Sequence, residues 1–195
     1  MMNVPPYTGL ISNACVYGLP ESVKASKYPM AVNTDECTTD IVPRTYNLAT
    51  AEIGSGHDNF LNGIIVQFDL TLPIKVWTEI QRYHFIDFVS SQSTMHRIAK
   101  FDFDESYQEH VDKRAIKLMK VLLKAYNSDP TEDNYLTLLY TNPCGFKLTA
   151  RMTTNYRQLK TIYAQRRNHK LPEWRQFCNW IENALPFGKE WLSDD

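Results

Sequence analysis

The segment from Ile64 to Leu72 constrains the fold most, because every second residue along it is apolar. The apolar positions are Ile64, Val66, Phe68, Leu70 and Leu72, and Ile65, Gln67, Asp69 and Thr71 lie between them. A period of two is typical of a β-strand with one buried face. Such a strand needs neighbouring strands and a covering layer, and Pro73 after it is suited to open a helix.

Other segments show helical spacing or the residue types of strands. The longest expected helix spans Ser106 to Tyr126, with apolar residues three and four positions apart. Shorter helices are expected at 74–82, 132–139, 155–163 and 172–185, and further strands at 83–93 and 146–152. The sequence therefore predicts a single α+β domain, residues 1–195, with an antiparallel sheet packed by long helices. Residues 61–195 form its core, and residues 1–60 are expected to be an irregular wrap or lid with one short helix near 21–27.

Composition excludes several classes of protein. The chain has 195 residues, is 43% hydrophobic and carries a net charge of −1, so no global charge attracts nucleic acid or an anionic membrane. Its start resembles no signal peptide, and no apolar run approaches the roughly 20 residues that span a bilayer. We expect a soluble, cytoplasmic protein. The four cysteines are scattered, which favours free thiols over a metal site, and Cys178 falls on the apolar face of an expected helix.

Residues 147–175 are rich in Lys and Arg, with Glu173 as the only acid. At 100° per residue, Arg166 shares a helix face with Leu159, Ile162 and Tyr163, whereas Arg157, Lys160 and Arg167 share the opposite face. An inward guanidinium needs an anionic partner. Two alternatives stay open for Arg166, a buried ion pair and a clamp on a ligand phosphate.

Small polar residues follow the expected strand that begins at Tyr83. Ser90, Ser91, Gln92 and Ser93 either cap an edge strand or bind a ligand. His84 is expected to be structural, and no G-x-S-x-G motif supports a hydrolase. His57 lies in a glycine-rich loop that lacks the spacing of a phosphate-binding loop.

In order, these pieces resemble the flavin-dependent thymidylate synthases over roughly residues 57 to 185. That family has a histidine in a loop, a strand, a helix opened by proline, and the signature R-H-R-x-x-S-x-N-E-x-S-x-R. Its signature serine aligns with Ser93. Its later pattern of T-x-N-x-R-x-L, a further arginine and E-I-R is echoed by Thr153, Asn155, Arg157, Leu159, Arg166 and Glu173-Trp174-Arg175.

The resemblance implies a transferase that moves a one-carbon unit from methylenetetrahydrofolate to C5 of a pyrimidine deoxynucleotide, dUMP above all. FAD would carry hydride from NADPH, and the protein would form a homotetramer with shared sites. The implied flavin-binding residues are His57, His84, Asn155 and Arg157. The implied nucleotide-binding residues are Ser91, Gln92, Ser93 and Arg166, with Arg166 and Ser93 in the catalytic site.

The chain departs from the family pattern at several cations. Tyr83 and Phe85 replace the two signature arginines, Met95 replaces a third, and Leu139 stands where the family has a phosphate-binding arginine. Arg82, Arg97 and Arg151 are candidate substitutes. Two alternatives therefore stay open, a related hydroxymethylase of dUMP or dCMP, and an inactive nucleotide-binding or assembly subunit.

Overall fold

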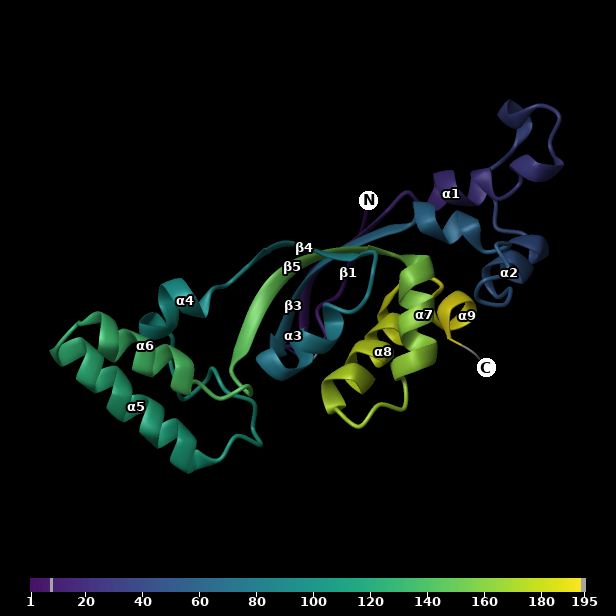
Figure 1. Ribbon diagram of the computed structural model, residues 1–195. Helices are drawn as coiled ribbons and strands as arrows, with labels where there is room; N and C mark the ends of the chain where they lie inside the picture. The colour runs from purple at the N-terminus through teal and green to yellow at the C-terminus, as the bar shows by residue number, and fades with distance from the viewer. Residues whose placement is uncertain (8, 194–195) are drawn as a thin grey trace. The chain divides into compact units, whose positions relative to one another are not determined.

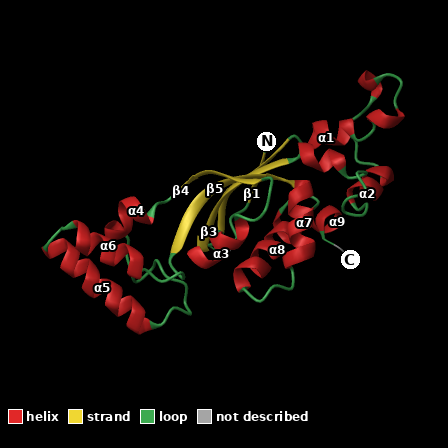
Figure 2. Ribbon diagram, viewed as in Figure 1, coloured by secondary structure: helices red, strands yellow, loops and turns green. Residues whose placement is uncertain are grey.

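A computed structural model describes residues 1–7 and 9–193, and its strands form one sheet (Figures 1 and 2). The strand order is β1-β2-β3-β5-β4. The strands are β1 (Met2–Val4), β2 (Ile11–Tyr17), β3 (Ile65–Pro73), β4 (Ile86–Ser91) and β5 (Lys147–Asn155). β2 runs antiparallel to both β1 and β3. The predicted α+β class with an antiparallel sheet is confirmed.

The alternating segment forms β3 as predicted. Val66, Phe68 and Leu70 are fully buried, while the residues between them are half-buried. Pro73 is the N-cap of α3 (Ile74–Ile80), so it separates strand from helix as expected.

The chain folds as two compact units, and the boundary expected near residue 60 falls inside the first. This first unit comprises residues 1–70, 84–89 and 151–195. Its helices include α1 (Leu19–Ala25), α2 (Pro43–Ala49), α7 (Tyr156–Arg166), α8 (Pro172–Ala184) and α9 (Gly188–Leu192). The aromatic rings of Phe68, Phe177 and Trp180 meet in its core, with centroids 5.0 to 5.8 Å apart. α7 packs against both α8 and α9.

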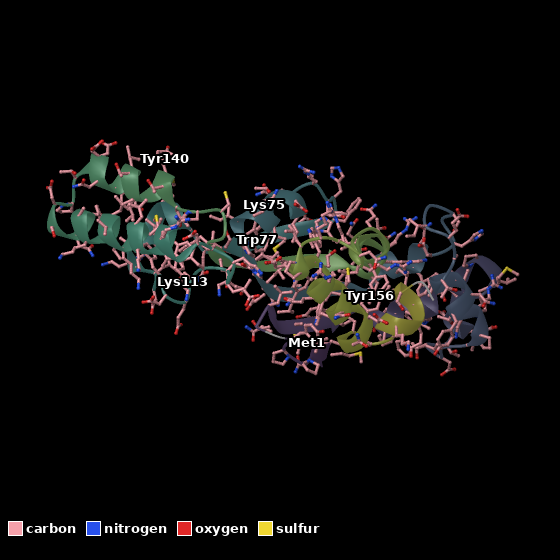
Figure 3. The ribbon with its side chains drawn as sticks, turned by 90° about the horizontal axis from the view of Figure 1, so that it is seen from below. Met1, Lys75, Trp77, Lys113, Tyr140 and Tyr156 are labelled. Carbon is pink, nitrogen blue, oxygen red and sulfur yellow. The ribbon has the colours of Figure 1, made fainter. Side chains whose placement is uncertain are left out.

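The second unit comprises residues 71–83 and 90–150. Its helices include α3, α4 (Thr94–Arg97), α5 (Lys113–Ser128) and α6 (Glu132–Thr141). α5 and α6 form a pair, on which Lys113 and Tyr140 are labelled in Figure 3. The apolar core of this unit contains Ile98, Phe103, Tyr107, Met119, Leu138 and Phe146. Thr131 caps α6 by accepting a hydrogen bond from the Asn134 amide, as the sequence predicts.

Some predicted elements differ from the structure. Within residues 1–7 and 9–60 the structure has two strands and two α-helices where an irregular wrap was expected. The sequence does not indicate β2, because an irregularity in register between Ser12 and Cys15 hides its alternation. Asn13 there has a φ of 50°. Helix α5 begins at Lys113 rather than Ser106, since Tyr107 pairs with Phe146 in an isolated bridge. α9 was not predicted. No helix among the described residues is long and apolar enough to cross a membrane.

Candidate functional site

The first turn of α7 carries two of the predicted flavin-binding residues. Asn155 is its N-cap, and its Oδ1 accepts a hydrogen bond of 2.9 Å from the Gln158 amide. Arg157 follows within the first turn. The amide groups at a helix N-terminus carry partial positive charge, so a cation placed beside them adds to a site that favours anions.

A fully buried carboxylate, Asp58, lies against this turn and was missed by the sequence analysis. Arg157 Nε lies 3.0 Å from Asp58 Oδ1, and Lys160 Nζ lies 3.5 Å from Oδ2. Lys160 also donates to the carbonyl oxygens of Ala49, at 2.8 Å, and Ala51. Asp58 Oδ1 has no partner in hydrogen-bond geometry. Two cations therefore face one carboxylate, and this leaves net positive charge next to the N-terminus of α7.

The prediction that Lys160 lies on the outer face of its helix is wrong. Lys160 is only 3% exposed, because the segment from Ala49 to Asp58 covers the face of α7 that the helical wheel assigned to water. The helical-wheel argument assumes that only one face of the helix packs against the protein, whereas other segments pack against two faces of α7. The nearest signal in the sequence is Asp58 itself, an acid in a glycine-rich loop that also holds His57.

Arg157 is held differently from Lys160. About a third of its side chain is exposed (31%), although Nε is paired with Asp58. A guanidinium carries five N–H donors, so the exposed part retains donors for a second anion. The arrangement thus fixes Arg157 through a buried carboxylate and presents its remaining donors outward.

Arg166 and Arg167 show the difference that helical spacing predicts, since Arg166 is half-buried and Arg167 is exposed. The Arg166 guanidinium lies 4.8 Å from the centroid of the buried Trp174 ring, which is a cation–π contact. Arg166 follows Arg157 by nine positions, and at 1.5 Å per residue this places them about 14 Å apart along the helix. Arg166 therefore does not join the cluster at the start of α7.

Arg166 also affects the neighbouring Cys178. Burial raises the pKa of the Cys178 thiol to about 12, and the positive charges of Arg166 and Arg167 oppose this rise. Cys178 is buried as expected, and such a thiol stays protonated and unreactive near neutral pH.

The two histidines predicted to hold flavin are both exposed. His57 precedes Asp58 in the loop that Lys160 holds. His84 precedes Phe85, whose φ is 61° although its side chain is bulky, and whose ring is 68% exposed. The Phe85 carbonyl accepts a 2.7 Å hydrogen bond from Thr154, the residue before Asn155. The position that replaces a signature arginine is therefore tied to the start of α7.

Arg151, a candidate substitute for a lost arginine, is engaged within the sheet. Its Nη1 donates to the Asn13 carbonyl at 2.7 Å and lies 3.2 Å from Asp69 Oδ1. The side chain joins β2, β3 and β5, which is a structural role.

The remaining predicted residues belong to the second unit. Gln92 pairs with Thr149 of β5 through its backbone amide and its side-chain carbonyl, at 3.0 and 2.9 Å. Ser93 is half-buried and stands as the N-cap residue of α4, while Ser91 is exposed at the end of β4. Arg82 and Arg97 are exposed, after α3 and at the end of α4. The sequence left strand capping and ligand binding as alternatives for this segment. The structure has both features, because Gln92 pairs with the neighbouring strand while Ser91 is exposed.

Comparison with solved structures shows extensive likeness in fold. Two structures of the flavin-dependent thymidylate synthase of Helicobacter pylori with FAD and dUMP match with TM-scores of 0.68 and 0.70, at 16% and 15% identity. Each match covers 98% of this chain and 97% of the other. A UMP/dUMP methylase from Streptomyces cacaoi, bound with 5-Br dUMP, matches with a TM-score of 0.63 and 14% identity, over 89% of this chain and 87% of the other.

Sequence comparison gives no further assignment, because no family model and no curated protein matches this chain. The likeness in fold extends over nearly the whole chain, including the first sixty residues, where the sequence resemblance was not seen. At the level of fold it confirms the resemblance that Ser93, Asn155, Arg157 and Arg166 indicated. The chain has the fold of the flavin-dependent thymidylate synthases.

Proposed function

We propose that this chain is a divergent transferase that moves a one-carbon unit from methylenetetrahydrofolate to C5 of dUMP, with FAD as hydride carrier and NADPH as reductant. The main support is one observation. The fold matches enzymes solved with FAD and dUMP over 98% of the chain, and Asn155 and Arg157 stand at the start of α7 where the sequence pattern of that family has them.

The residues at the start of α7 fit an anionic cofactor such as FAD. The excess positive charge beside Asp58, the partly exposed Arg157 and the helix N-terminus all favour phosphate. Asn155, Arg157, His57 and His84 are the proposed flavin-binding residues. When bound, FAD would supply hydride transfer, while the protein binds and orients the reactants.

Arg166 is the proposed phosphate ligand of the nucleotide, and its contact with Trp174 fixes the direction of its guanidinium. Ser91, Gln92 and Ser93 are proposed to contact the nucleotide, with Ser93 beside the reacting ring. Arg82 and Arg97 are proposed as additional phosphate ligands. Arg151 would first have to leave Asn13 and Asp69, so we assign it no ligand.

We propose a homo-oligomer, a tetramer by analogy, with sites shared between subunits. Two observations support an assembly. Arg157 and Arg166 lie at opposite ends of α7, so they do not form one cluster within a chain. β4 is an edge strand and exposes the apolar side chain of Val89 at 60%, and association commonly covers apolar residues on such an edge.

Two alternative functions keep specific support. A hydroxymethylase of dUMP or dCMP would use the same scaffold, because the fold does not fix the oxidation level of the transferred carbon. An inactive nucleotide-binding or assembly subunit is favoured by the lost cations. Leu139, where the family has an arginine, packs against the apolar core of the second unit, and Phe85 presents an aromatic ring instead of a charge.

The visible spectrum of the purified protein tests the proposal first. We expect flavin absorption at about one FAD per chain, either as purified or after FAD is added. Bound dUMP should also raise the melting temperature, since a ligand that binds only the folded state stabilises it. Protein that binds no flavin but is stabilised by dUMP would support the inactive subunit, and larger stabilisation by dCMP would favour the hydroxymethylase.

A matched pair of variants tests the nucleotide site. Arg166→Ala should lose most of the stabilisation by dUMP, because a charged hydrogen bond to phosphate is worth about 1.5 to 3 kcal/mol. Arg167→Ala, one residue further and exposed, should retain it. Equal losses in the two variants would contradict the role given to Arg166.

A further inference from the structure

Helix α5 of the second unit has an outward face that combines lysines with exposed apolar side chains. The helix has 16 residues and is therefore about 24 Å long, at 1.5 Å per residue. Its inner face is anchored by Met119, which is fully buried in the apolar core of the unit. Figure 3 shows the side chains of α5 and labels Lys113 at its start. The sequence has no acid between residues 113 and 128, so every charge on this helix is positive.

Most of these cations have no partner. The exposed side chains that make no hydrogen bond or ion pair with residues 1–7 or 9–193 are Lys113, Lys117 and Lys124. Acids in the segment before the helix engage the others, because Arg114 lies 2.7 Å from Asp112 and Lys120 lies 2.5 Å from Asp104. The unpaired lysines would therefore gain from acids on another molecule.

Apolar side chains lie beside the lysines. At 100° per residue, Leu118, Val121 and Ala125 form a strip next to Lys117 and Lys124, which we call the outer seam. Leu118 is 48% exposed and Val121 is 63% exposed. Spacings of three and four residues are those of the a and d positions at which two helices pack together. α5 thus has one apolar side in the core and a second that is exposed.

The lysines beside the outer seam stand where helix pairs select their partners. With Leu118 at position a and Val121 at position d, Lys117 and Lys124 fall at position g. Charges at e and g form salt bridges across the seam of a helix pair, so lysines at g favour acids on the facing helix. A second α5 supplies no acid, and an antiparallel pair of α5 helices would place lysine against lysine. Charge therefore favours a different protein over a second copy.

The outer seam also favours a helix over a nucleic acid. Contacts with phosphate would use the lysines but leave Leu118 and Val121 in water. Removing apolar side chains from water is favourable, so an occupant that covers the seam and pairs the lysines gains from both. An amphipathic helix with acidic residues has this combination.

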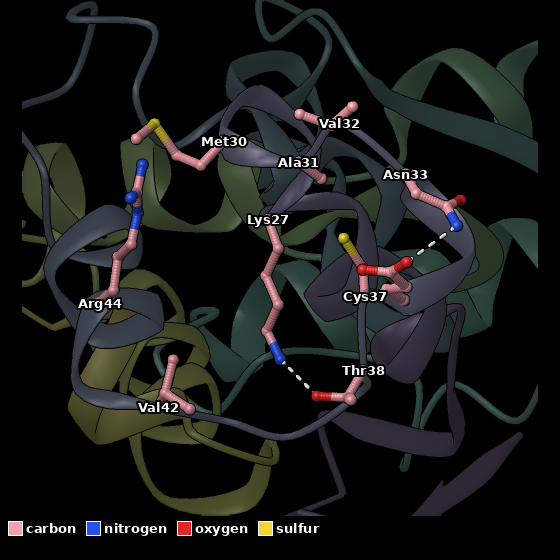
Figure 4. A pocket seen from close by; sticks show the side chains of 10 residues that line it. Lys27, Met30, Ala31, Val32, Asn33, Cys37, Thr38, Val42 and Arg44 are labelled. Atoms are coloured by element: carbon pink, nitrogen blue, oxygen red, sulfur yellow. Dashed lines mark hydrogen bonds between the residues drawn. The ribbon is translucent and has the colours of Figure 1, made fainter.

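The hollow formed by residues 27–44 in the first unit differs from this face. Its volume is about 730 Å³, and Figure 4 shows the side chains that line it. Such a volume is typical of sites for small organic ligands. Glu36 lines it together with Lys27 and Arg44, and Lys27 donates to the Thr38 hydroxyl at 2.8 Å. Its mixed charges do not select one class of ligand, whereas the outward face of α5 selects an acidic one.

We propose that the outward face of α5 is a docking surface for an amphipathic, acidic helix of another protein. Apolar side chains of the partner pack on Leu118, Val121 and Ala125, and its acids pair with Lys117 and Lys124. None of these residues is proposed to bind flavin or nucleotide, so the inference does not depend on the proposed function.

Fluorescence anisotropy with a labelled synthetic helix tests the proposal on the full chain. The probe is a peptide of about three heptads, with leucine at a and d and glutamate at e and g. We expect saturable binding of this acidic peptide. One control peptide has alanine in place of leucine and another has lysine in place of glutamate, and both should bind at least about tenfold more weakly, because each lacks one of the two contributions.

Variants of exposed residues test each part of the surface. Lys117→Glu with Lys124→Glu should weaken binding of the acidic peptide about tenfold or more and create binding of the lysine peptide, because attraction and repulsion exchange. The matched control is Lys170→Glu with Lys189→Glu, which changes the net charge equally in the first unit and should leave binding unchanged. Leu118→Asn with Val121→Asn should also weaken binding about tenfold, although all lysines remain. Circular dichroism checks that each variant folds.

Several results would overturn the inference. Absence of peptide binding, equal weakening by the control pair of variants, or binding that survives the change of the outer seam would each do so. A single-stranded oligonucleotide whose binding needs the α5 lysines but not the outer seam would indicate a nucleic-acid site instead. Sedimentation velocity measures the mass of the assembly, and a smaller assembly after the change of the outer seam would show that a second copy covers this face.

Discussion

Replacing Lys160 by methionine should destabilise the protein more than any other change of a lysine. The ammonium group is buried, pairs with Asp58 and donates to the carbonyl oxygens of Ala49 and Ala51. Methionine fills similar volume but cannot donate, so two carbonyl groups lose their partner. Among the described residues, Arg157 would then be the one cation left in contact with the buried Asp58 carboxylate.

The expected loss follows from the burial of these groups. Removing one partner of a buried ion pair typically costs about 3 to 5 kcal/mol. Total stability of domains is about 5 to 15 kcal/mol, so the change removes a large part of it. In a chain of this length each kcal/mol corresponds to about 2 to 4 °C, so we expect the melting temperature to fall by about 6 to 20 °C.

Urea unfolding followed by far-ultraviolet circular dichroism measures the loss. Lys189→Met is the matched control, because Lys189 is an exposed lysine on α9 of the same unit, and it should change stability by less than about 0.5 kcal/mol. Adding Asp58→Asn to Lys160→Met should cost less than the sum of the single changes, since both act on one pair. A loss below 1 kcal/mol for Lys160→Met, or additive losses in the double variant, would refute the role given to this cluster.

Three further predictions concern single side chains. Burial raises the pKa of the Cys178 thiol from 9.0 to about 12, so the contribution of this thiol to stability should persist below pH 9 and disappear as the pH rises through 12. A thiol reagent at pH 8 should label the exposed Cys144 but not Cys178, and equal labelling rates would contradict this. Phe85→Gly should raise the free energy of unfolding by about 1 kcal/mol, because it relieves the strain at a φ of 61°, whereas Phe88→Gly in β4 should lower it. Asn155→Ala should lower the free energy of unfolding by about 1 kcal/mol, because the cap of α7 is lost. Asn155→Asp keeps a capping oxygen and should be nearly as stable as the original protein, and urea unfolding measures both variants.

Strands β3, β4 and β5 and most helices could be predicted because their signals are local. The alternation around Phe68 requires only the geometry of one strand, and the caps at Thr131 and Asn155 bind amides three residues away. β2 could not be predicted, because its irregular register at Ser12 and Cys15 breaks the same alternation.

Within the candidate site, the sequence could predict only the features that depend on the geometry of a single helix. The exposure difference between Arg166 and Arg167 follows from 100° per residue. The pairing of Asp58 with Lys160 depends on a loop 102 residues earlier in the chain, and no periodicity in α7 indicates that this loop covers it. The spacing of residues within a helix therefore does not show which distant segments of the chain pack against that helix.

The hollow formed by residues 27–44 has a consequence for how this protein can change. Its walls come from the loop between α1 and α2 and from Arg44 at the start of α2, and none of its lining side chains belongs to the buried core. Insertions, deletions and substitutions there alter the shape and charge of the hollow without removing core packing, and surface loops tolerate such changes at small cost in stability. Any ligand preference of the hollow can therefore diverge while the sheet and the α7 cluster stay the same, and exchanging this loop alone between relatives would be a direct way to transfer a preference.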